Sequence, residues 1–194
     1  MKIKDRNITT WPNLGVNYWG VTKCANSTIK THLWELEHNS KFAINKDTAI
    51  HSDIYVSRLT EYQALHSTNE NFTVVRHPVS RFKSIYRDLV LSRVRVGKKA
   101  SIEGFNIDQV LDYLETHSDS VRNVHLKSQS AFVNHDIKII HLENLYNEWD
   151  FDFEPPAFKK NVTRNQDNII LTSYQTDRIY KIYQKDFIKF GYEK

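Results

Sequence analysis

The stretch VTKCANSTIKTHL, residues 21–33, has the residue types of an anion-binding loop. Lys23 offers a full positive charge on a flexible stem, Ser27 and Thr28 offer hydroxyl donors, and apolar residues at helical spacing follow. The N–H groups at the start of a helix bind anions, aided by the helix dipole. The stretch is therefore a candidate phosphate-binding loop.

The same stretch differs from the glycine-rich phosphate loop of nucleotide-binding ATPases. That loop needs glycines and a lysine directly before its Ser or Thr, whereas Lys23 stands four positions before Ser27. Taken alone, the stretch also fits an ordinary helix start with a surface lysine.

A second stretch, FTVVRHPVSRFKSIYRD at residues 72–88, has an arginine at the end of a short apolar strand. Pro78 then suits the first turn of a helix, and Ser84 lies eight residues after Arg76, about two turns into that helix. Together Arg76 and Ser84 suit a second phosphate, which the arginine would bind in bidentate fashion. The structural alternative pairs Arg76 with a carboxylate and packs Ser84 against a neighbouring helix.

Strands that alternate with helices must position both loops. The pattern predicts an α/β fold, a three-layer P-loop-like arrangement with a mainly parallel central sheet flanked by helices, in a single domain over residues 1–194. In such sheets ligands bind beyond the carboxyl ends of the strands, where both loops fall. Buried strands are expected at 15–21, 72–75 and 137–142, a further strand at 41–46, and a strand or helix start at 54–59. Apolar spacing predicts one helix that contains Ile29 and Leu33 and another that contains Phe82, Ile85 and Leu89. Two more helices are expected, one that begins after the cap Asn106, and a last one that begins at the capping box of Thr172 and Gln175 and ends at Gly191.

Composition limits the classes of protein that the chain can form. Of its 194 residues 40% are hydrophobic and 12% aromatic, which is typical of a globular protein, and its net charge of +4 suits an anionic ligand. A single cysteine, Cys24, excludes an intramolecular disulfide and a cysteine-based zinc site. No apolar run reaches the length of a membrane span or of a signal-peptide core, so we expect a cytoplasmic protein with no membrane span.

Taken together, the two stretches resemble the sulfotransferases that use 3′-phosphoadenosine 5′-phosphosulfate (PAPS), in particular the carbohydrate sulfotransferase branch. TKCANSTI is similar to their 5′-phosphosulfate loop, and VVRHPVSRFKSIYRD matches their 3′-phosphate motif, Arg-x-Pro-x-x-Arg-x-x-Ser-x-Tyr, at every fixed position. HLKSQ at 125–129 and DFIKFGY at 186–192 resemble two further segments of the family. Two departures are Thr22, where proline is usual, and His77, where Asp, Asn or Glu is common.

The resemblance implies PAPS as the sulfuryl donor, 3′-phosphoadenosine 5′-phosphate (PAP) as the product, and no metal. It implies that Lys23 binds the donor and also stabilises the bridging oxygen during catalysis, and that Arg76 and Ser84 hold the 3′-phosphate. The remaining roles that it implies are donor binding by Cys24, Ala25, Asn26, Ser27, Thr28 and Lys160, and substrate binding by Asp53, His125 and Gln129.

A hydroxyl acceptor needs a general base, which the family places between its two phosphate loops. His51, Asp53 and Glu61 occupy that segment here. His51 is favoured because an ordinary histidine has a pKa near 6.5, which suits a base at neutral pH. Asp53 and Glu61 stay open as alternatives, and His125 is a further one.

The expected partner is an acceptor substrate, a glycan, and not nucleic acid. The short chain favours a bacterial or viral enzyme over an animal Golgi enzyme, and no pattern in it specifies an oligomeric state. Two other functions stay open. A nucleotide or small-molecule kinase would depend on magnesium, and a non-catalytic module for nucleic acid or anionic glycan would bind with steep salt dependence.

Overall fold

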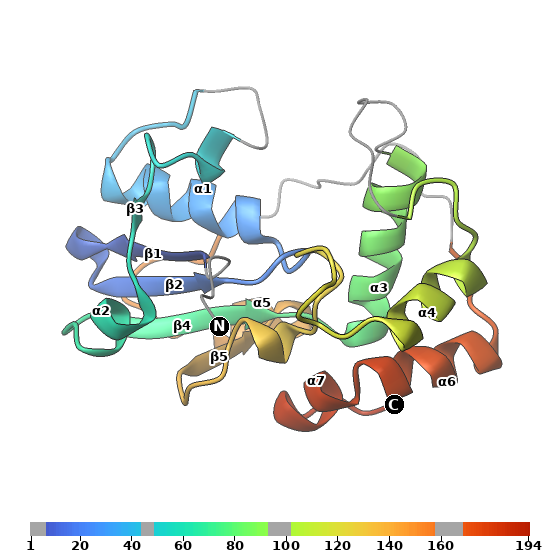
Figure 1. The fold of residues 1–194 in the computed structure, drawn as a ribbon. Coiled ribbons are helices and arrows are strands. Elements are labelled where there is room, and N and C mark those ends of the chain that lie inside the picture. Colours follow the sequence, from blue (N-terminus) through green and yellow to red (C-terminus); the bar gives the residue numbers. More distant parts are fainter. Residues whose placement is uncertain (1–6, 44–48, 93–101, 158–168) are drawn as a thin grey trace. The chain divides into compact units, whose positions relative to one another are not determined.

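The computed structural model describes residues 7–43, 49–92, 102–157 and 169–194 (Figure 1). The chain divides into two compact units, each built from two separate parts of the sequence. The first unit is Met1–Val75 with Phe132–Asn161, and the second is Arg76–Ala131 with Val162–Lys194. The single domain over residues 1–194 stays a prediction.

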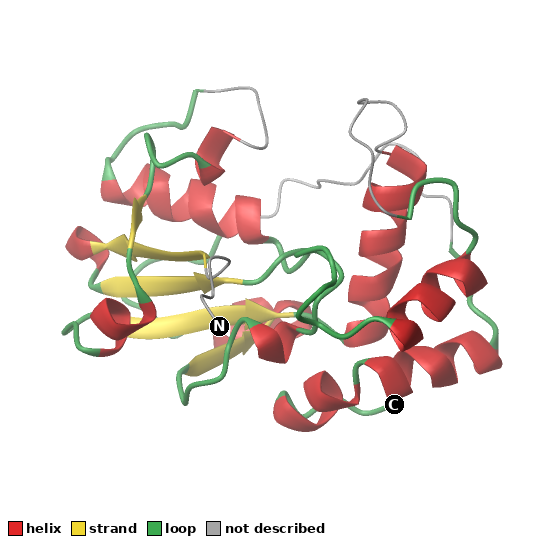
Figure 2. Cartoon of the chain, viewed as in Figure 1, coloured by secondary structure: helices red, strands yellow, loops and turns green. Residues whose placement is uncertain are grey.

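The first unit contains a five-stranded sheet in the order β3-β1-β2-β4-β5 (Figure 2). β2 pairs with β4, and β4 with β5, in parallel, whereas β1 pairs antiparallel with both β2 and β3. Four of the described strands therefore run in one direction and β1 runs against them, which confirms the predicted α/β fold with a mainly parallel sheet. The strands are β1 (Asn7–Trp11), β2 (Val16–Gly20), β3 (Ser57–Arg58), β4 (Glu70–Val75) and β5 (Lys138–His141).

Three of the expected strands are confirmed, because β2, β4 and β5 lie within or across the predicted ranges. β1 was not predicted, because the paired threonines of NITTW obscure the alternation of apolar and polar residues. Within the expected strand at 41–46, residues 41–43 form no strand and the others lie outside the described residues.

Helix α1 (Asn26–Glu37) covers the apolar face of the sheet. Its Ile29 and Leu33 lie one turn apart, are fully buried, and share a core cluster with Tyr18 of β2 and Phe72 of β4. Burial of such side chains contributes about 1.5–3 kcal/mol each. The helix that the apolar spacing predicts is therefore the one that the sheet needs.

The opposite face of the sheet carries polar side chains that contact α2. Residues alternate along a strand, so Asn17 faces away from Tyr18, and its amide lies 3.4 Å from the carbonyl of Ala64 in α2. Asn71 of β4 donates to the same carbonyl at 2.9 Å. Helices thus flank both faces. The helices and turns of this unit are η1 (Pro12–Leu14), α1, η2 (Ala49–His51), α2 (Glu61–Leu65), η6 (Leu142–Asn144) and α5 (Leu145–Glu148).

The described part of the second unit is helical. Pro78 begins α3, as predicted, and the expected capping box of Thr172 and Gln175 begins α6. The single last helix that we predict is wrong, because the chain leaves helical geometry at Tyr183, whose hydroxyl donates to the carbonyl of Leu126 at 3.0 Å. The helices of this unit are α3 (Pro78–Tyr86), the π-helical η3 (Arg87–Ser92), α4 (Ile107–Thr116), η5 (Gln129–Ala131), α6 (Ser173–Ile182) and α7 (Gln184–Lys189).

Candidate active site

The two predicted phosphate loops begin at the carboxyl ends of neighbouring strands. β2 and β4 pair in parallel, so Gly20 and Val75 end them at the same edge of the sheet. The first loop, residues 21–25, follows Gly20, and Arg76 follows Val75 directly. This is the edge at which parallel α/β sheets bind their ligands.

The backbone of the first loop adopts a conformation that residues with a side chain rarely use. Lys23 and Ala25 have φ angles of 66° and 56°, in the left-handed region. Such residues cost roughly 1–2 kcal/mol each and occur preferentially at functional sites. Ala25 precedes α1 and its side chain provides no hydrogen bond to the N–H groups of the helix. When left-handed residues precede a helix, they turn successive N–H groups toward one point. This loop therefore fits a bound anion.

Gly20 is needed where β2 leads into this loop. A Cβ atom at Gly20 would lie 2.5 Å from Oδ1 and 3.2 Å from Cγ of Asn26, and 3.2 Å from the carbonyl oxygen of Asn7. The Oδ1 atom of Asn26 is itself buried and has no hydrogen-bond partner in the described part of the chain. The side chain of Asn26 therefore packs over Gly20 and fixes the first residue of α1 against the strand, a role that the sequence analysis did not assign to Gly20.

Ser27 and His51 contact each other across 24 residues of sequence. The Ser27 hydroxyl lies 2.8 Å from Nε2 of His51, which ends the short helix η2. The His51 carbonyl accepts a hydrogen bond of 2.6 Å from the Arg58 guanidinium. The residue that we predict to be the general base is thus in direct contact with the predicted phosphate loop.

The surroundings of His51 favour its neutral form. Burial, and then the positive charges of Lys30 and Arg58, lower the pKa of His51 from 6.5 to about 4. A histidine with this pKa is neutral at pH 7 and can accept a proton.

Lys30 is a residue of this site that the sequence analysis missed. It lies on α1, is fully buried, and donates to the side chain of Asn7. Burial, followed by the Arg58 charge, lowers the pKa of Lys30 to about 7, and the Asp53 charge opposes this. Its spacing was the available signal, because a lysine three residues after Ser27 lies on the same side of the helix.

The alternative bases have other partners. Asp53 forms an ion pair with Arg58, and its side chain is 78% exposed. Glu61 forms a close contact with His135. The described geometry therefore favours His51, whose Nε2 lies 2.8 Å from the Ser27 hydroxyl, over both carboxylates.

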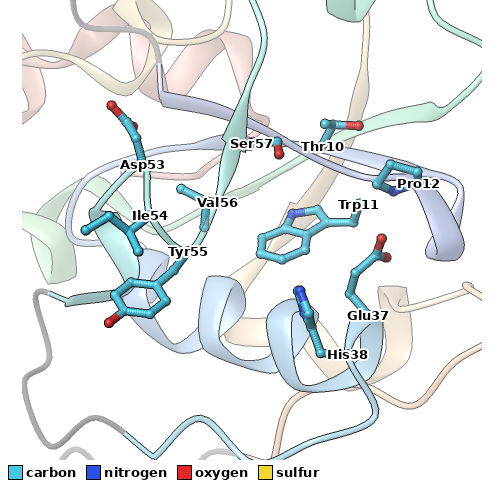
Figure 3. Close-up of a pocket in the computed structure, with 10 residues that line it drawn as sticks. All are labelled: Thr10, Trp11, Pro12, Glu37, His38, Asp53, Ile54, Tyr55, Val56 and Ser57. Atoms are coloured by element: carbon cyan, nitrogen blue, oxygen red, sulfur yellow. The ribbon is translucent and has the colours of Figure 1, made fainter.

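Asp53 also lines a pocket of about 320 Å³ beside α1 (Figure 3). Trp11 and Pro12 lie on one side of it, and Glu37 and His38, at the end of α1, close another. Glu37 and His38 come from the end of α1 opposite the phosphate loop. The substrate-binding role of Asp53 therefore stays a prediction.

The backbone of Arg76 is held by the side chain of Gln129. The Arg76 N–H donates to Oε1 of Gln129 at 2.9 Å, and Nε2 of Gln129 donates to the Arg76 carbonyl at 2.8 Å. Within the residues that the structure describes, the Arg76 guanidinium makes no hydrogen bond or ion pair, which leaves it available for an anion. Gln129 is fully buried, and its predicted substrate-binding role stays a prediction.

The other predicted residues are found in several settings. Ser84 lies on α3 and is half-buried, and His125 accepts from Arg81 through its carbonyl at 3.3 Å. Cys24 is fully buried and its Sγ contacts the Thr22 carbonyl at 3.7 Å, and its donor-binding role stays a prediction. Lys160 lies outside the described residues.

Parallel strands, a left-handed loop before a helix and an arginine after the next strand define an α/β protein suited to phosphorylated ligands. A family model described as "Sulfotransferase family" matches residues 6–153, a range that includes both loops and most of the chain. The chain belongs to the sulfotransferase family, an enzyme family that uses PAPS. The comparisons with curated proteins and with solved structures gave no match.

Two further observations concern the described residues alone. No three or more of their His, Cys, Asp and Glu side chains are grouped in a way that would hold a metal ion. None of their helices has the length and apolar character needed to cross a bilayer.

Proposed function

We propose that this sulfotransferase moves a sulfuryl group from PAPS to a hydroxyl or amine of an acceptor, and that the acceptor is a carbohydrate. The contact between Ser27 and His51 carries the proposal. It joins a histidine that is neutral at pH 7 to a loop whose backbone fits an anion, which is the combination that sulfuryl transfer to a hydroxyl requires.

The two loops bind the two phosphorylated ends of the donor. The loop with Lys23, Ser27 and Thr28 binds the 5′-phosphosulfate, supported by its left-handed backbone before α1. Arg76 and Ser84 bind the 3′-phosphate, supported by the guanidinium of Arg76 that lacks a partner among the described residues. Fixing the donor in this way contributes by orientation, which supplies roughly 7–11 kcal/mol of the barrier in favourable reactions.

The residues of the first loop and His51 divide the chemistry. Bound PAPS supplies the sulfuryl group and a phosphate that gains negative charge as it leaves. Lys23 and the N–H groups at the start of α1 stabilise that charge, which is usually the largest catalytic contribution. His51 takes the acceptor proton on Nε2, and for this it exchanges its contact with Ser27 for the acceptor. The Ser27 hydroxyl then donates to the phosphosulfate.

The pKa of about 4 applies to His51 in the chain without a bound donor. Lys30 and Arg58 lower it, and a bound anionic donor brings negative charge to the same loop. Negative charge favours the protonated form of a histidine, so donor binding raises the pKa of His51 toward neutrality. His51 thus becomes a stronger base when the donor is present.

The carbohydrate acceptor rests on the resemblance of residues 74–88 and 125–129 to the carbohydrate branch of the family. The cytoplasmic location and the bacterial or viral origin stay predictions from the sequence.

The proposal is tested by calorimetry with PAP and by transfer of labelled sulfate from PAPS to a panel of glycans. We expect the wild-type chain to bind PAP at micromolar concentrations or below. Lys23→Ala and Arg76→Ala should each weaken binding by roughly ten-fold or more, as loss of a charged hydrogen bond does. Lys41→Ala, a change at an exposed lysine, serves as the matched control and should bind like the wild type. A wild-type chain that does not bind PAP refutes the proposal.

A further inference from the structure

We propose that Gln129 and Asp186 are positioning residues, which hold Arg76 in the geometry that binds the 3′-phosphate of the donor. The inference rests on the proposed function, because it takes Arg76 as the ligand of that phosphate. Gln129 and Asp186 themselves are fully buried, so they act on the donor only through other residues.

The first link joins Gln129 to the backbone of Arg76. After β4 ends at Val75, the N–H and carbonyl of Arg76 need partners, because unpaired buried backbone groups are costly. The amide of Gln129 supplies one acceptor and one donor, at 2.9 and 2.8 Å. Two bonds to one residue fix its backbone dihedral angles, and with them the direction in which the Arg76 side chain leaves the chain.

A glutamine amide supplies both the acceptor and the donor that these two bonds require. Glutamate has the same shape as glutamine but only accepts hydrogen bonds at neutral pH, so at position 129 it would oppose the Arg76 carbonyl. The pairing is therefore specific to glutamine chemistry as well as to its size.

The second link joins Gln129 to α7 near the end of the chain. The two oxygens of the Asp186 carboxylate accept from the backbone N–H groups of Gln129 and Ser130, each at 2.8 Å. These bonds cap the short helix η5 that carries Gln129. Asp186 thus fixes the backbone from which the Gln129 side chain reaches Arg76.

The charge of Asp186 has a buried counterpart in Arg81. Burial raises the pKa of Asp186, and the Arg81 charge and the two N–H donors oppose this rise. Arg81 is itself only 1% exposed and donates to the carbonyl of His125 at 3.3 Å, four residues before Gln129. Buried polar groups joined in this way are costly to break, since each lost partner leaves the other unpaired. The set is therefore rigid, as a support for Arg76 should be.

The test compares two nucleotides, PAP and adenosine 5′-phosphate, which differ by the 3′-phosphate alone. We expect the wild-type chain to bind PAP more tightly in calorimetry. Gln129→Glu should lower the affinity for PAP by roughly ten-fold, as loss of one buried hydrogen bond and a new repulsion would, and should leave the affinity for adenosine 5′-phosphate unchanged. Gln184→Glu makes the same chemical change at an exposed position of α7 and should behave like the wild type.

Two further variants separate positioning from a loss of folding. Asp186→Asn keeps one acceptor oxygen. It should also weaken PAP binding without changing the affinity for adenosine 5′-phosphate, but by less than Gln129→Glu does. In an Arg76→Ala background Gln129→Glu should cause no additional loss of PAP affinity, because both changes act through one guanidinium.

The outcomes distinguish the inference from the proposed function. A wild-type chain that binds both nucleotides equally overturns the role of Arg76, and the inference falls with it. The other case is a wild-type chain that prefers PAP. If Gln129→Glu and Asp186→Asn then keep that preference, or lose affinity for both nucleotides equally, the inference alone is overturned.

Discussion

Lys30 gives the sharpest test of the electrostatics around His51. Lys30→Met removes a buried positive charge while it keeps a side chain of similar length. Lys30 is the second cause, after burial, of the low pKa of His51, and Arg58 is the third. The variant should therefore raise the pKa of His51 above its value of about 4 but not to 6.5, because burial and Arg58 remain.

The size of the effect follows from the protonation of His51. At pH 6 a histidine with a pKa of about 4 is roughly 99% neutral, whereas one with a pKa of 6.5 is only about 25% neutral. The lowered pKa thus keeps the base available in mild acid. In transfer assays kcat/KM for PAPS reports the enzyme before the donor binds. Its acid limb should have a midpoint far below pH 6.5 for the wild type, and Lys30→Met should move that midpoint upward.

The assay that needs no acceptor is an NMR titration of the histidine Cε1–H signals. His51→Gln identifies the signal of His51 among those of nine histidines. Lys41→Met, at an exposed lysine of the same unit, is the matched control and should leave the titration unchanged. Added PAP should raise the pKa of His51, because its phosphates bring negative charge to the Ser27 loop.

Two results would refute the reasoning. One is a wild-type His51 that titrates at the ordinary pKa of 6.5, which would mean that the described burial and charges do not act on it. The other is a Lys30→Met variant whose His51 titrates at the wild-type pH.

Two other variants test the first loop. Gly20→Ala places a methyl group against the Asn26 side chain. It should lower the free energy of unfolding, measured by urea denaturation, by roughly 1–3 kcal/mol, and it should also weaken PAP binding. Unchanged stability would mean that Asn26 does not pack there. Ser27→Ala removes a hydroxyl that contacts His51 and should lower both donor affinity and transfer rate; a variant with wild-type PAP affinity and rate would exclude Ser27 from the site.

The parts of the fold that the sequence predicts are those set by local chemistry. The strand before the first loop, the apolar spacing of Ile29 and Leu33, and the capping box of Thr172 depend on residues within a few positions of one another. Local chemistry does not mark the break at Tyr183, where the chain leaves helical geometry and the Tyr183 hydroxyl donates to the carbonyl of the distant Leu126, so the prediction of one last helix is wrong.

The contacts that assemble the candidate site were harder to predict, since they join distant segments. Ser27 meets His51 only because η2 returns to the start of α1, and Gln129 reaches Arg76 across 53 residues of sequence. Lys30 was missed because its burial depends on groups from other segments, such as Asn7, that cover its side of α1. The sequence predicts His51, Arg76 and Gln129 as site residues, but it does not show that His51 contacts Ser27 or that Gln129 contacts Arg76.

Both candidate phosphate loops share one physical device. In each, a residue outside the proposed donor contacts fixes the backbone of one that we propose to bind the donor. Gly20 does so through the close packing of Asn26, and Gln129 does so through its two bonds to Arg76. A phosphate bound by N–H groups and one guanidinium needs those donors fixed before it arrives, because ordering them on binding would cost affinity. Buried positions such as 20 and 129 should therefore influence donor affinity nearly as strongly as the positions that bind it.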